Sequence, residues 1–296
     1  MLSVLIPTYN HNVLPLVTAL NSELLELEIP YEILVFDDGS TEWLEENKKV
    51  GEFQKTTFRR YEQNKGRSAI RNALASSAKY AMLLFLDADV MPVSTTFIGT
   101  YVQTIKTNKA TVIYGGVAYN EEKPPIENRL RWEYGSNREV KAVSERQKRP
   151  HFVITQNVAI EKEVYLNLNI PTSNFYGDDL VFSQELKRKQ IEVLHIHNPV
   201  YHLGLETSQQ YLEKALSAVK SIVALEKKGG IDNDFTKLQQ TYLKIKKSGG
   251  LGIFKWFIAP KKQKMEQNFL SEKPNLRWFD LYRLLYYIEL KSDPNA

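Results

Sequence analysis

The stretch MLLFLDADVMP, residues 82–92, sets the problem that this sequence poses. A run of large apolar residues, typical of a buried strand, leads directly into two acids, Asp87 and Asp89, that are one residue apart. Ionised carboxylates at the edge of a hydrophobic core are costly unless something compensates their charge. The stretch therefore predicts a strand whose end meets a metal ion, a basic side chain or water, and by itself it leaves these three open.

Segments typical of strands alternate with segments typical of helices around this stretch. Such alternation predicts an α/β fold, with a Rossmann-like, mainly parallel central sheet flanked by helices on both faces. In sheets of this kind, ligands bind at the carboxyl ends of the strands. Because the turn at residues 7–9, the acids Asp37 and Asp38, and the acids Asp87 and Asp89 all follow expected strands, we expect one crevice to collect them.

The second half of the sequence has a different pattern. Residues 120–151 are highly charged, and we expect much of this segment to be a mobile loop, with a helix at residues 126–134. From Ser208 onward the pattern is helical, with breaks at two glycine pairs, residues 229–230 and 249–250. We therefore expect a domain at residues 1–225 and a basic, aromatic-rich, helical C-terminal extension at residues 226–296.

Charge is unevenly distributed along the chain. The 296 residues carry a formal net charge of +4, with 43% hydrophobic and 25% charged residues, which is typical of a globular protein. Residues 226–296 hold 14 Lys and Arg against 8 Asp and Glu, whereas the preceding part holds 25 against 27. The positive charge therefore belongs to the extension, which argues against nucleic-acid binding by the main domain and indicates a separate task for the extension.

The cysteine content and the N-terminal stretch bear on location. The sequence has no cysteine, which excludes disulfides, thiolate catalysis and cysteine-ligated metal sites, and suits a reducing compartment. The apolar stretch MLSVLIPTYN has no basic region before it and no small-residue cleavage site after it, so it indicates a first strand rather than a signal peptide. No apolar run approaches the roughly 18 residues that a membrane span needs. We therefore expect a cytoplasmic protein.

Six short motifs follow one another along the expected strand ends and helix starts. They are SVLIPTYN, ILVFDDGST, NKGRSAIRNAL, FLDADVMP, YGDDLVFSQELKRK and NPVYHLG, and they lie within roughly residues 1–225. In this order they resemble the motifs of family 2 glycosyltransferases of the inverting, bacterial type. The resemblance implies the GT-A fold and sugar transfer of the hexosyltransferase type.

The resemblance implies a metal site at the Asp-x-Asp motif. The second acid, Asp89, would be a metal ligand, and the first, Asp87, would contact the ribose or metal-bound water. His202, in the late NPVYHLG motif, would complete the metal site. Carboxylate and imidazole ligands suit Mn²⁺ or Mg²⁺, and such an ion compensates the charge of a leaving diphosphate.

Nucleotide contacts are implied for two earlier motifs. Asp38 would meet the base, although the Asp-Gly-Ser-Thr sequence that it begins is also ordinary turn chemistry. The start of the helix in NKGRSAIRN would lie along the nucleotide, because helix N-termini and basic side chains bind phosphate. The implied nucleotide-binding residues are Pro7, Tyr9, Asp38, Lys65, Gly66, Arg67, Arg71 and Asp87.

The YGDD motif resembles the acidic motif that carries the catalytic base. Inverting transfer requires a carboxylate to accept the proton of the acceptor hydroxyl as its oxygen attacks the anomeric carbon. The family usually has Glu-Asp here, whereas this chain has Asp178 and Asp179. Asp179 therefore aligns with the base, and Asp178 with the acid that contacts the acceptor. Asn157, in the sequence TQN, is a further candidate for acceptor binding.

Basic residues are interleaved with large aromatic residues in two segments of the extension. These are GGLGIFKWFIAPKKQK, where the basic residues are lysines, and LRWFDLYRLLYYIEL, where they are arginines. Such interleaving is typical of peripheral membrane contact, which here would be with the inner face of the cytoplasmic membrane. Aromatic residues at helical spacing are equally typical of internal packing or of a homodimer interface. The sequence leaves these interpretations open.

Taken together, the motifs predict a metal-dependent, inverting glycosyltransferase. The expected donor is a nucleotide-sugar, specifically a UDP-sugar, and the acceptor is a hydroxyl of a glycan or lipid-linked molecule in surface polysaccharide synthesis. One alternative is a nucleotidyltransferase, which is expected to have a Gly-rich, Arg/Lys-containing loop after the first strand, where this chain has PTYNHN. The other alternative is a non-catalytic nucleotide-binding or scaffold protein, against which Asp87, Asp89 and Asp179 argue.

Overall fold

The structure is a computed structural model that describes residues 1–108, 110–171 and 177–293. Contacts within the chain define two compact units. Unit 1 consists of residues 1–119 and 140–204, and unit 2 of residues 120–139 and 205–296. The domain limit expected near residue 225 falls inside a helix of unit 2, α9 (Ser208–Lys227). The expected domain bounds stay a prediction.

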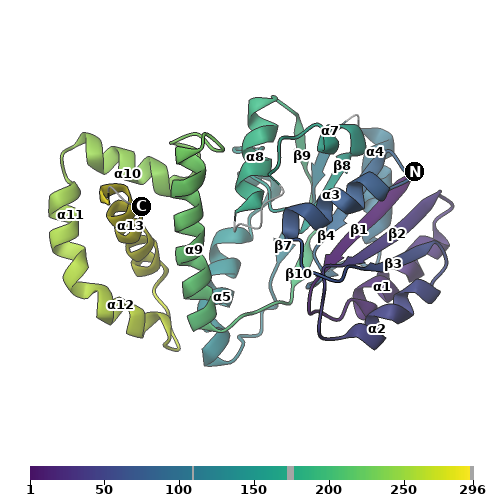
Figure 1. Cartoon of the computed structure of the whole chain (residues 1–296), viewed down its shortest axis with the longest axis horizontal. Helices are drawn as coiled ribbons and strands as arrows, with labels where there is room; N and C mark the ends of the chain where they lie inside the picture. Colours follow the sequence, from purple (N-terminus) through teal and green to yellow (C-terminus); the bar gives the residue numbers. More distant parts are fainter. Residues whose placement is uncertain (109, 172–176, 294–296) are drawn as a thin grey trace. The chain divides into compact units, whose positions relative to one another are not determined.

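Within the described residues, unit 1 is built around a seven-stranded sheet with the strand order β3-β2-β1-β4-β8-β6-β9 (Figure 1). The first four strands in the sequence are mutually parallel, β6 and β9 are parallel, and β8 is antiparallel to both of its neighbours. The sheet is therefore mainly parallel, as predicted. Its strands are β1 (Leu2–Thr8), β2 (Tyr31–Asp37), β3 (Thr56–Arg60), β4 (Met82–Leu86), β6 (Val112–Tyr114), β8 (Asn157–Glu161) and β9 (Val193–His195).

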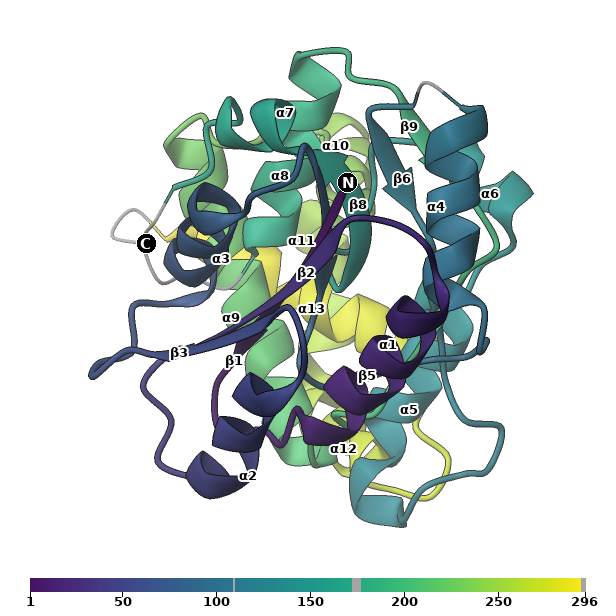
Figure 2. The same cartoon turned by 90° about the vertical axis from the view of Figure 1, so that its right-hand side faces the viewer.

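Helices cover both faces of this sheet, with α1 and α4 on one face and α3 on the other (Figure 2). Because successive residues of a strand point to opposite faces, each strand contributes to two cores. Val4 and Ile6 of β1 pack with α1 and α4, whereas Leu5 between them packs with α3 and α8. The helices of unit 1 are α1 (Leu14–Glu26), α2 (Leu44–Lys48), η1 (Lys49–Glu52), α3 (Arg67–Ser77), α4 (Phe97–Thr107), α6 (Val143–Gln147), α7 (Lys162–Leu166) and α8 (Asp178–Arg188).

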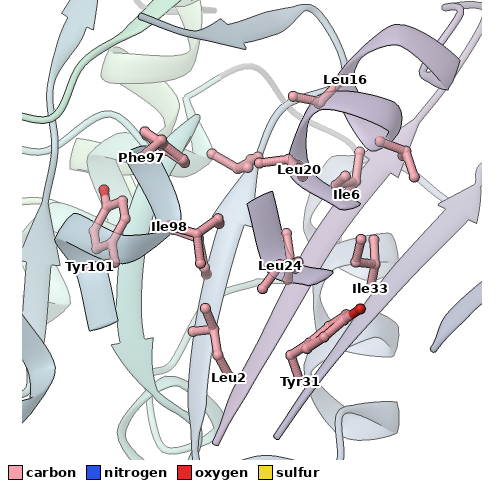
Figure 3. Close-up of a cluster of buried hydrophobic side chains, with 14 of the residues drawn as sticks. Leu2, Ile6, Leu16, Leu20, Leu24, Tyr31, Ile33, Phe97, Ile98 and Tyr101 are labelled. Atoms are coloured by element: carbon pink, nitrogen blue, oxygen red, sulfur yellow. The ribbon is translucent and has the colours of Figure 1, made fainter. Parts of the chain in front are cut away.

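The first of these cores packs α1 and α4 against one face of the sheet (Figure 3). Leu16, Leu20 and Leu24 recur at helical spacing, so they share the face of α1 that packs on Ile6 and Ile33 of the sheet. All five side chains are at most 1% exposed. Burying one such side chain contributes about 1.5–3 kcal/mol, so this core fixes the positions of β1 and β2 rigidly.

A second sheet, three-stranded within the described residues, has the strand order β5-β10-β7. Its strands are β5 (Val90–Pro92), β7 (Val117–Ala118) and β10 (Val200–His202). β5 begins directly after Asp89, and its antiparallel pairing with β10 places Val90 opposite His202. This pairing brings the late His motif beside the Asp-x-Asp motif, although the two are far apart in the sequence.

The charged segment at residues 120–151 is largely helical, so the expectation of a mobile loop is wrong. The helix expected at residues 126–134 is confirmed, and further turns follow it. Leu130 is fully buried, the Trp132 indole N–H donates to the Asn120 carbonyl at 2.8 Å, and Arg131 pairs with Glu139 at 3.1 Å. Buried apolar anchors and paired charges thus order a segment whose composition alone indicated a loop. Its elements are η2 (Ile126–Asn128), α5 (Arg129–Tyr134), the π-helical η3 (Gly135–Glu139) and α6.

The rest of unit 2 is helical, and its helices break at both glycine pairs, as predicted. Gly229 and Gly249 have φ values of 71° and 72°, a left-handed conformation that ends helices and that glycine adopts without steric cost. No helix of the described residues is long and apolar enough to cross a membrane. The helices are α9, α10 (Lys237–Lys247), α11 (Leu251–Ile258), η4 (Ala259–Lys261), α12 (Lys262–Phe269) and α13 (Leu276–Ser292).

Candidate functional site

A pocket of about 350 Å³ lies at the carboxyl ends of β1, β2 and β4. The parallel register explains why these ends meet, since Thr8 lies opposite Asp37, and β4 runs beside β1. The predicted crevice is present, although Asp37 is fully buried and does not line it. Its volume is within the range of small-molecule sites. Its lining residues are Pro7, Thr8, Tyr9, Asp38, Asn64, Gly66, Arg67, Ile70, Arg71, Asp87, Ala88 and Asp89.

Asp38 connects the end of β2 to the start of α3. Its carboxylate accepts the backbone N–H of Lys65 at 2.7 Å and that of Gly66 at 2.9 Å, one on each oxygen. Burial raises the pKa of Asp38, and these two hydrogen bonds oppose the rise. Gly66 has a φ of 91°, which favours glycine at this N-cap. Each carboxylate oxygen has a second lone pair, so Asp38 can still accept a hydrogen bond from a ligand in the pocket.

Arg71 joins two acidic motifs. One of its terminal nitrogens donates to Asp87 and the other to Asp178 at 2.9 Å. Arg71 is buried, and although burial opposes its charge, the two carboxylates raise its pKa above the ordinary value. Arg67, one helical turn earlier, approaches the same carboxylates at 3.4 Å and 3.8 Å but is about half exposed. The basic partner of Asp87 is therefore a pair of arginines on α3.

Asp89 has a different partner. Its Oδ2 atom lies 3.2 Å from Nε2 of His202, whose ring packs against that of Tyr119. Burial opposes ionisation of Asp89, but the hydrogen bond and charge of His202 lower its pKa. The Leu203 N–H donates to the Asp89 carbonyl at 2.8 Å, and a Cβ atom on Gly204 would lie 2.1 Å from Oδ2. The turn after β10 therefore needs glycine for the Asp89 carboxylate to occupy its position.

Asp178 and Asp179 begin α8, where the helix dipole favours acids. Asp178 is buried against Arg71, whereas Oδ1 of Asp179 accepts the backbone N–H of Thr155 at 3.1 Å and also its hydroxyl. Burial and the neighbouring Asp178 raise the pKa of Asp179. Both of these hydrogen bonds go to the same carboxylate oxygen, so Thr155 anchors Asp179 through Oδ1.

Asp178, Asp179 and His202 do not line this pocket, and the side chains of Lys65 and Asn157 have partners elsewhere. The Lys65 ammonium lies over the Tyr61 ring, 3.9 Å from its centroid, and only the Lys65 backbone meets Asp38. The Asn157 side chain is fully buried and donates to the carbonyls of Gly116 and Asn198 at 2.8 Å and 2.9 Å. Its amide oxygen accepts from a tyrosine hydroxyl at 2.7 Å. Asn157 therefore holds strands together in this structure, and its predicted acceptor contact stays a prediction.

Several residues of the site lie outside the motifs recognised in the sequence. Thr155 anchors Asp179, Tyr119 packs on His202, and the charge of His11 contributes to the lowered pKa of Asp89. His11 lies in PTYNHN, directly after the first strand, which is the one signal that could have indicated it. Thr155 and Tyr119 reach the site through the pairing of distant strands and had no local signal.

The donor set around Asp89 fits a divalent cation. Two ligands of Mg²⁺ or Mn²⁺ that occupy adjacent octahedral positions are about 3 Å apart. The 3.2 Å between Asp89 Oδ2 and His202 Nε2 is close to this separation. Among the described residues no cluster of three or more Asp, Glu, His or Cys side chains is placed to hold a metal ion. Asp89 and His202 are therefore the two described side chains here that could hold such an ion.

A mainly parallel sheet covered by helices on both faces, with a pocket at the carboxyl ends of its strands, defines an α/β protein with a ligand site of the kind that binds nucleotides. The family model described as "Glycosyl transferase family 2" matches residues 3–168, more than half of the chain. The chain therefore belongs to glycosyl transferase family 2 and is a glycosyltransferase. This favours sugar transfer over the two alternatives left by the sequence, a nucleotidyltransferase and a non-catalytic nucleotide-binding protein. No curated protein matches the chain by sequence.

Solved structures share the GT-A fold. The mannosyltransferase PcManGT from Pyrobaculum calidifontis, in complex with GDP-Man and Mn²⁺, matches with a TM-score of 0.62 at 16% identity, covering 98% of this chain and 86% of that one. S. aureus TarS in complex with UDP-GlcNAc matches with a TM-score of 0.51 at 15% identity, over 98% and 92%. A mycobacterial protein matches with a TM-score of 0.52 at 15% identity, over 78% and 75%. At these identities the likeness establishes the fold alone.

Proposed function

We propose that this glycosyltransferase is an inverting, metal-dependent enzyme that uses a nucleotide-sugar donor, specifically a UDP-sugar. Its acceptor is a hydroxyl of a glycan or of a lipid-linked molecule in surface polysaccharide synthesis. The observation that carries the proposal is the bridge made by Arg71, which links Asp87 of the Asp-x-Asp motif to Asp178 beside Asp179. This bridge brings a pocket suited to a nucleotide diphosphate next to a carboxylate suited to proton transfer.

The pocket supplies groups of the right kind for each part of the donor. Asp38 can accept the N–H of a base or a ribose hydroxyl, and Pro7 and Tyr9 line the same wall. The Tyr9 side chain is 52% exposed, so its ring is available to pack on a base. At the other wall, the N-terminus of α3 and the Arg67 guanidinium face the pocket and favour phosphate oxygens.

Asp89 and His202 would hold the metal ion. A divalent cation at this position supplies charge compensation for the diphosphate leaving group. Asp87 lies against Arg71 and Arg67, so its charge is already compensated, and its proposed contact is with the ribose or with metal-bound water. This assignment is supported by the separate partners of the two acids.

Asp179 is the proposed catalytic base. The Thr155 N–H and hydroxyl fix one carboxylate oxygen, which leaves the other to accept the proton of the attacking acceptor hydroxyl. The raised pKa of Asp179 suits this task, because a stronger base accepts a proton more readily. Asp178, held by Arg71, would contact the acceptor from the buried side of the pair.

The proposal is tested by binding and by turnover, measured separately. Isothermal titration calorimetry of UDP, with and without Mn²⁺, is expected to show binding that the metal strengthens. The substitution Asp89→Asn keeps the size of the side chain but removes the charge of a proposed metal ligand. It is therefore expected to abolish the effect of Mn²⁺ on binding and to lower the turnover number at least about a hundredfold.

Turnover is measured as UDP release from a panel of UDP-sugars, with GDP-Man as the comparison donor. If GDP-Man supports turnover and no UDP-sugar does, the base specificity is wrong although the chemistry stands. If no nucleotide binds in the presence of Mn²⁺ or Mg²⁺, the proposed function is wrong.

A further inference from the structure

Helix α11 presents an exposed apolar face. Ile253, Trp256 and Phe257 are 66%, 72% and 54% exposed, and their spacing of three and four residues places them on one side of the helix. The rings of Trp256 and Phe257 touch edge to face, with centroids 4.7 Å apart. A large tryptophan exposed to this degree beside two other large apolar side chains marks an interaction surface.

The opposite side of α11 is apolar too. Leu251, Phe254 and Ile258 are half-buried, and Ile258 packs against a core cluster that includes Phe269 and Tyr282. None of the residues of α11 is fully buried. A helix that is apolar on all sides is normally enclosed. Because only one side of α11 packs on its own unit, the other side is built to be covered by something apolar.

Lysines flank α11 along the chain, and no acid interrupts them in the sequence. Residues 237–264 contain eight lysines and not a single Asp or Glu. Lys244, Lys246 and Lys247 end α10, and Lys261 and Lys264 follow α11, all with exposed side chains. Within unit 2, α10, α11 and α12 form an arc along one side of α13, so these lysines flank α11 at both of its ends (Figure 1). We call the exposed side chains of α11 together with these five lysines the α11 surface.

We propose that the α11 surface docks onto a bilayer that contains anionic lipids. An apolar strip bordered by lysines has the composition of an interfacial helix, with Trp and Phe at the boundary of headgroups and acyl chains. Each lysine near an anionic leaflet adds attraction that is screened by salt. Cores of protein–protein interfaces are depleted of lysine, so the same composition argues against a second copy of this chain as the occupant.

The docking is peripheral. The eight residues of α11 extend about 12 Å at 1.5 Å per residue, far short of the hydrocarbon thickness. The helix therefore lies along the surface, with Ile253, Trp256 and Phe257 below the headgroups and the lysines at the level of the phosphates. Lys255, in the middle of α11, donates to the Ser292 hydroxyl at 3.3 Å and so turns away from the strip.

Vesicle co-sedimentation of the full chain tests this proposal. The probes are vesicles of phosphatidylcholine with about 30 mol% phosphatidylglycerol, compared with vesicles of phosphatidylcholine alone. We expect binding to the anionic vesicles that weakens with added salt. We expect the variant Ile253→Ser/Trp256→Ser/Phe257→Ser to lower the partition coefficient about tenfold or more. Absence of binding by the wild type, or equal binding by the variant, would overturn the proposal.

The matched control is Trp43→Ser, which removes a 45% exposed tryptophan outside the α11 surface and is expected to bind like the wild type. Melting curves of both variants show whether the fold is retained. Brominated lipids are expected to quench tryptophan fluorescence in the wild type and to lose most of that effect in Trp256→Phe, which keeps an apolar ring. Light scattering measures the molecular mass and so tests the alternative that a second copy of the chain covers this surface. If the wild type is a dimer and the triple variant is a monomer, the surface is a dimer interface and the proposal is wrong.

Discussion

Two pairs of acids meet at the site, and they come from different kinds of element. Asp87 and Asp89 follow the end of strand β4, whereas Asp178 and Asp179 begin helix α8. In each pair, one acid contacts the buried guanidinium of Arg71: Asp87 from the strand and Asp178 from the helix. A single cation between two carboxylates lowers the cost of burying both.

The other acid of each pair is held differently. Asp89 is beside His202, and Asp179 accepts two hydrogen bonds from Thr155. Neither arrangement includes a direct ion pair with Arg71. The comparison indicates a division of labour: one member of each pair fixes the architecture, and the other keeps a charge or a lone pair for a ligand.

The largest effect is expected for Asp179→Asn, which removes the proposed base and keeps an oxygen that can accept from Thr155. We expect the turnover number to fall by at least about a hundredfold, since general base catalysis contributes 10²–10⁴. Affinity for UDP with Mn²⁺, measured by calorimetry, should be unchanged. In the wild type, the rate should fall as the pH drops through the pKa of Asp179, which burial raises above its ordinary value of 3.8.

The melting temperature of the same variant provides a control with a definite sign. An acid whose pKa is raised on folding costs stability at pH values above that raised pKa, and the cost disappears below its ordinary pKa. Asp179→Asn should therefore melt slightly above the wild type near neutral pH, and the difference should vanish in acid. If the variant melts well below the wild type at neutral pH, Asp179 has a structural role, and the inferred difference between the two members of each acid pair is wrong.

Arg71→Met tests the role of the two acids that contact Arg71, Asp87 and Asp178. The substitution leaves the buried Asp178 and the partly buried Asp87 without the guanidinium that bridges them, so we expect the free energy of unfolding to fall by about 3–5 kcal/mol. Chemical denaturation measures the loss. The matched control is Arg67→Met, whose side chain is 47% exposed and contacts the same two acids at longer distances. Exposed pairs contribute about 1 kcal/mol or less, so similar losses from both variants would contradict the bridging role.

The smallest effect is expected for Gly204→Ala, which changes the position of Asp89, the acid proposed to bind the metal ion. The added Cβ atom would lie 2.1 Å from the Asp89 carboxylate and must displace it. We expect the Mn²⁺-dependent part of nucleotide affinity to weaken about tenfold, with little change in metal-free binding. Gly252→Ala is the control, because a Cβ atom there meets nothing within 4 Å. If the Mn²⁺ dependence of nucleotide affinity is unchanged in Gly204→Ala, Asp89 is not a metal ligand.

The sequence predicted the strands of unit 1 well, because buried parallel strands are nearly continuous apolar runs. MLLFL could be read as a strand without any knowledge of its neighbours, and the acids that follow it could be placed at the carboxyl edge. The glycine pairs at residues 229–230 and 249–250 ended helices as expected, since few other residues adopt a left-handed conformation without cost. These features depend on local chemistry and needed no tertiary information.

Prediction from sequence was least successful where charged residues are buried in pairs. Residues 120–151 have the composition of a loop, yet Arg131 and Glu139 pair and Leu130 is enclosed, which makes the segment largely helical. The sequence also does not show that the Asn157 amide nitrogen donates to the carbonyls of Gly116 and Asn198, because these partners come from distant segments. Composition does not report which polar groups find partners.

The sequence by itself determined the order of strands and helices, the acids at the strand ends and the lysine-rich, acid-free stretch at residues 237–264. These are properties of short windows, fixed by apolar periodicity and by side-chain chemistry. Only the tertiary structure decided which partner compensates each acid. Of the three possibilities that MLLFLDADVMP left open, Asp87 has a basic side chain, Arg71, while Asp89 lies 3.2 Å from the imidazole of His202. The physical reason is that charge compensation depends on distance in space, and the pairing of β5 with β10 sets that distance.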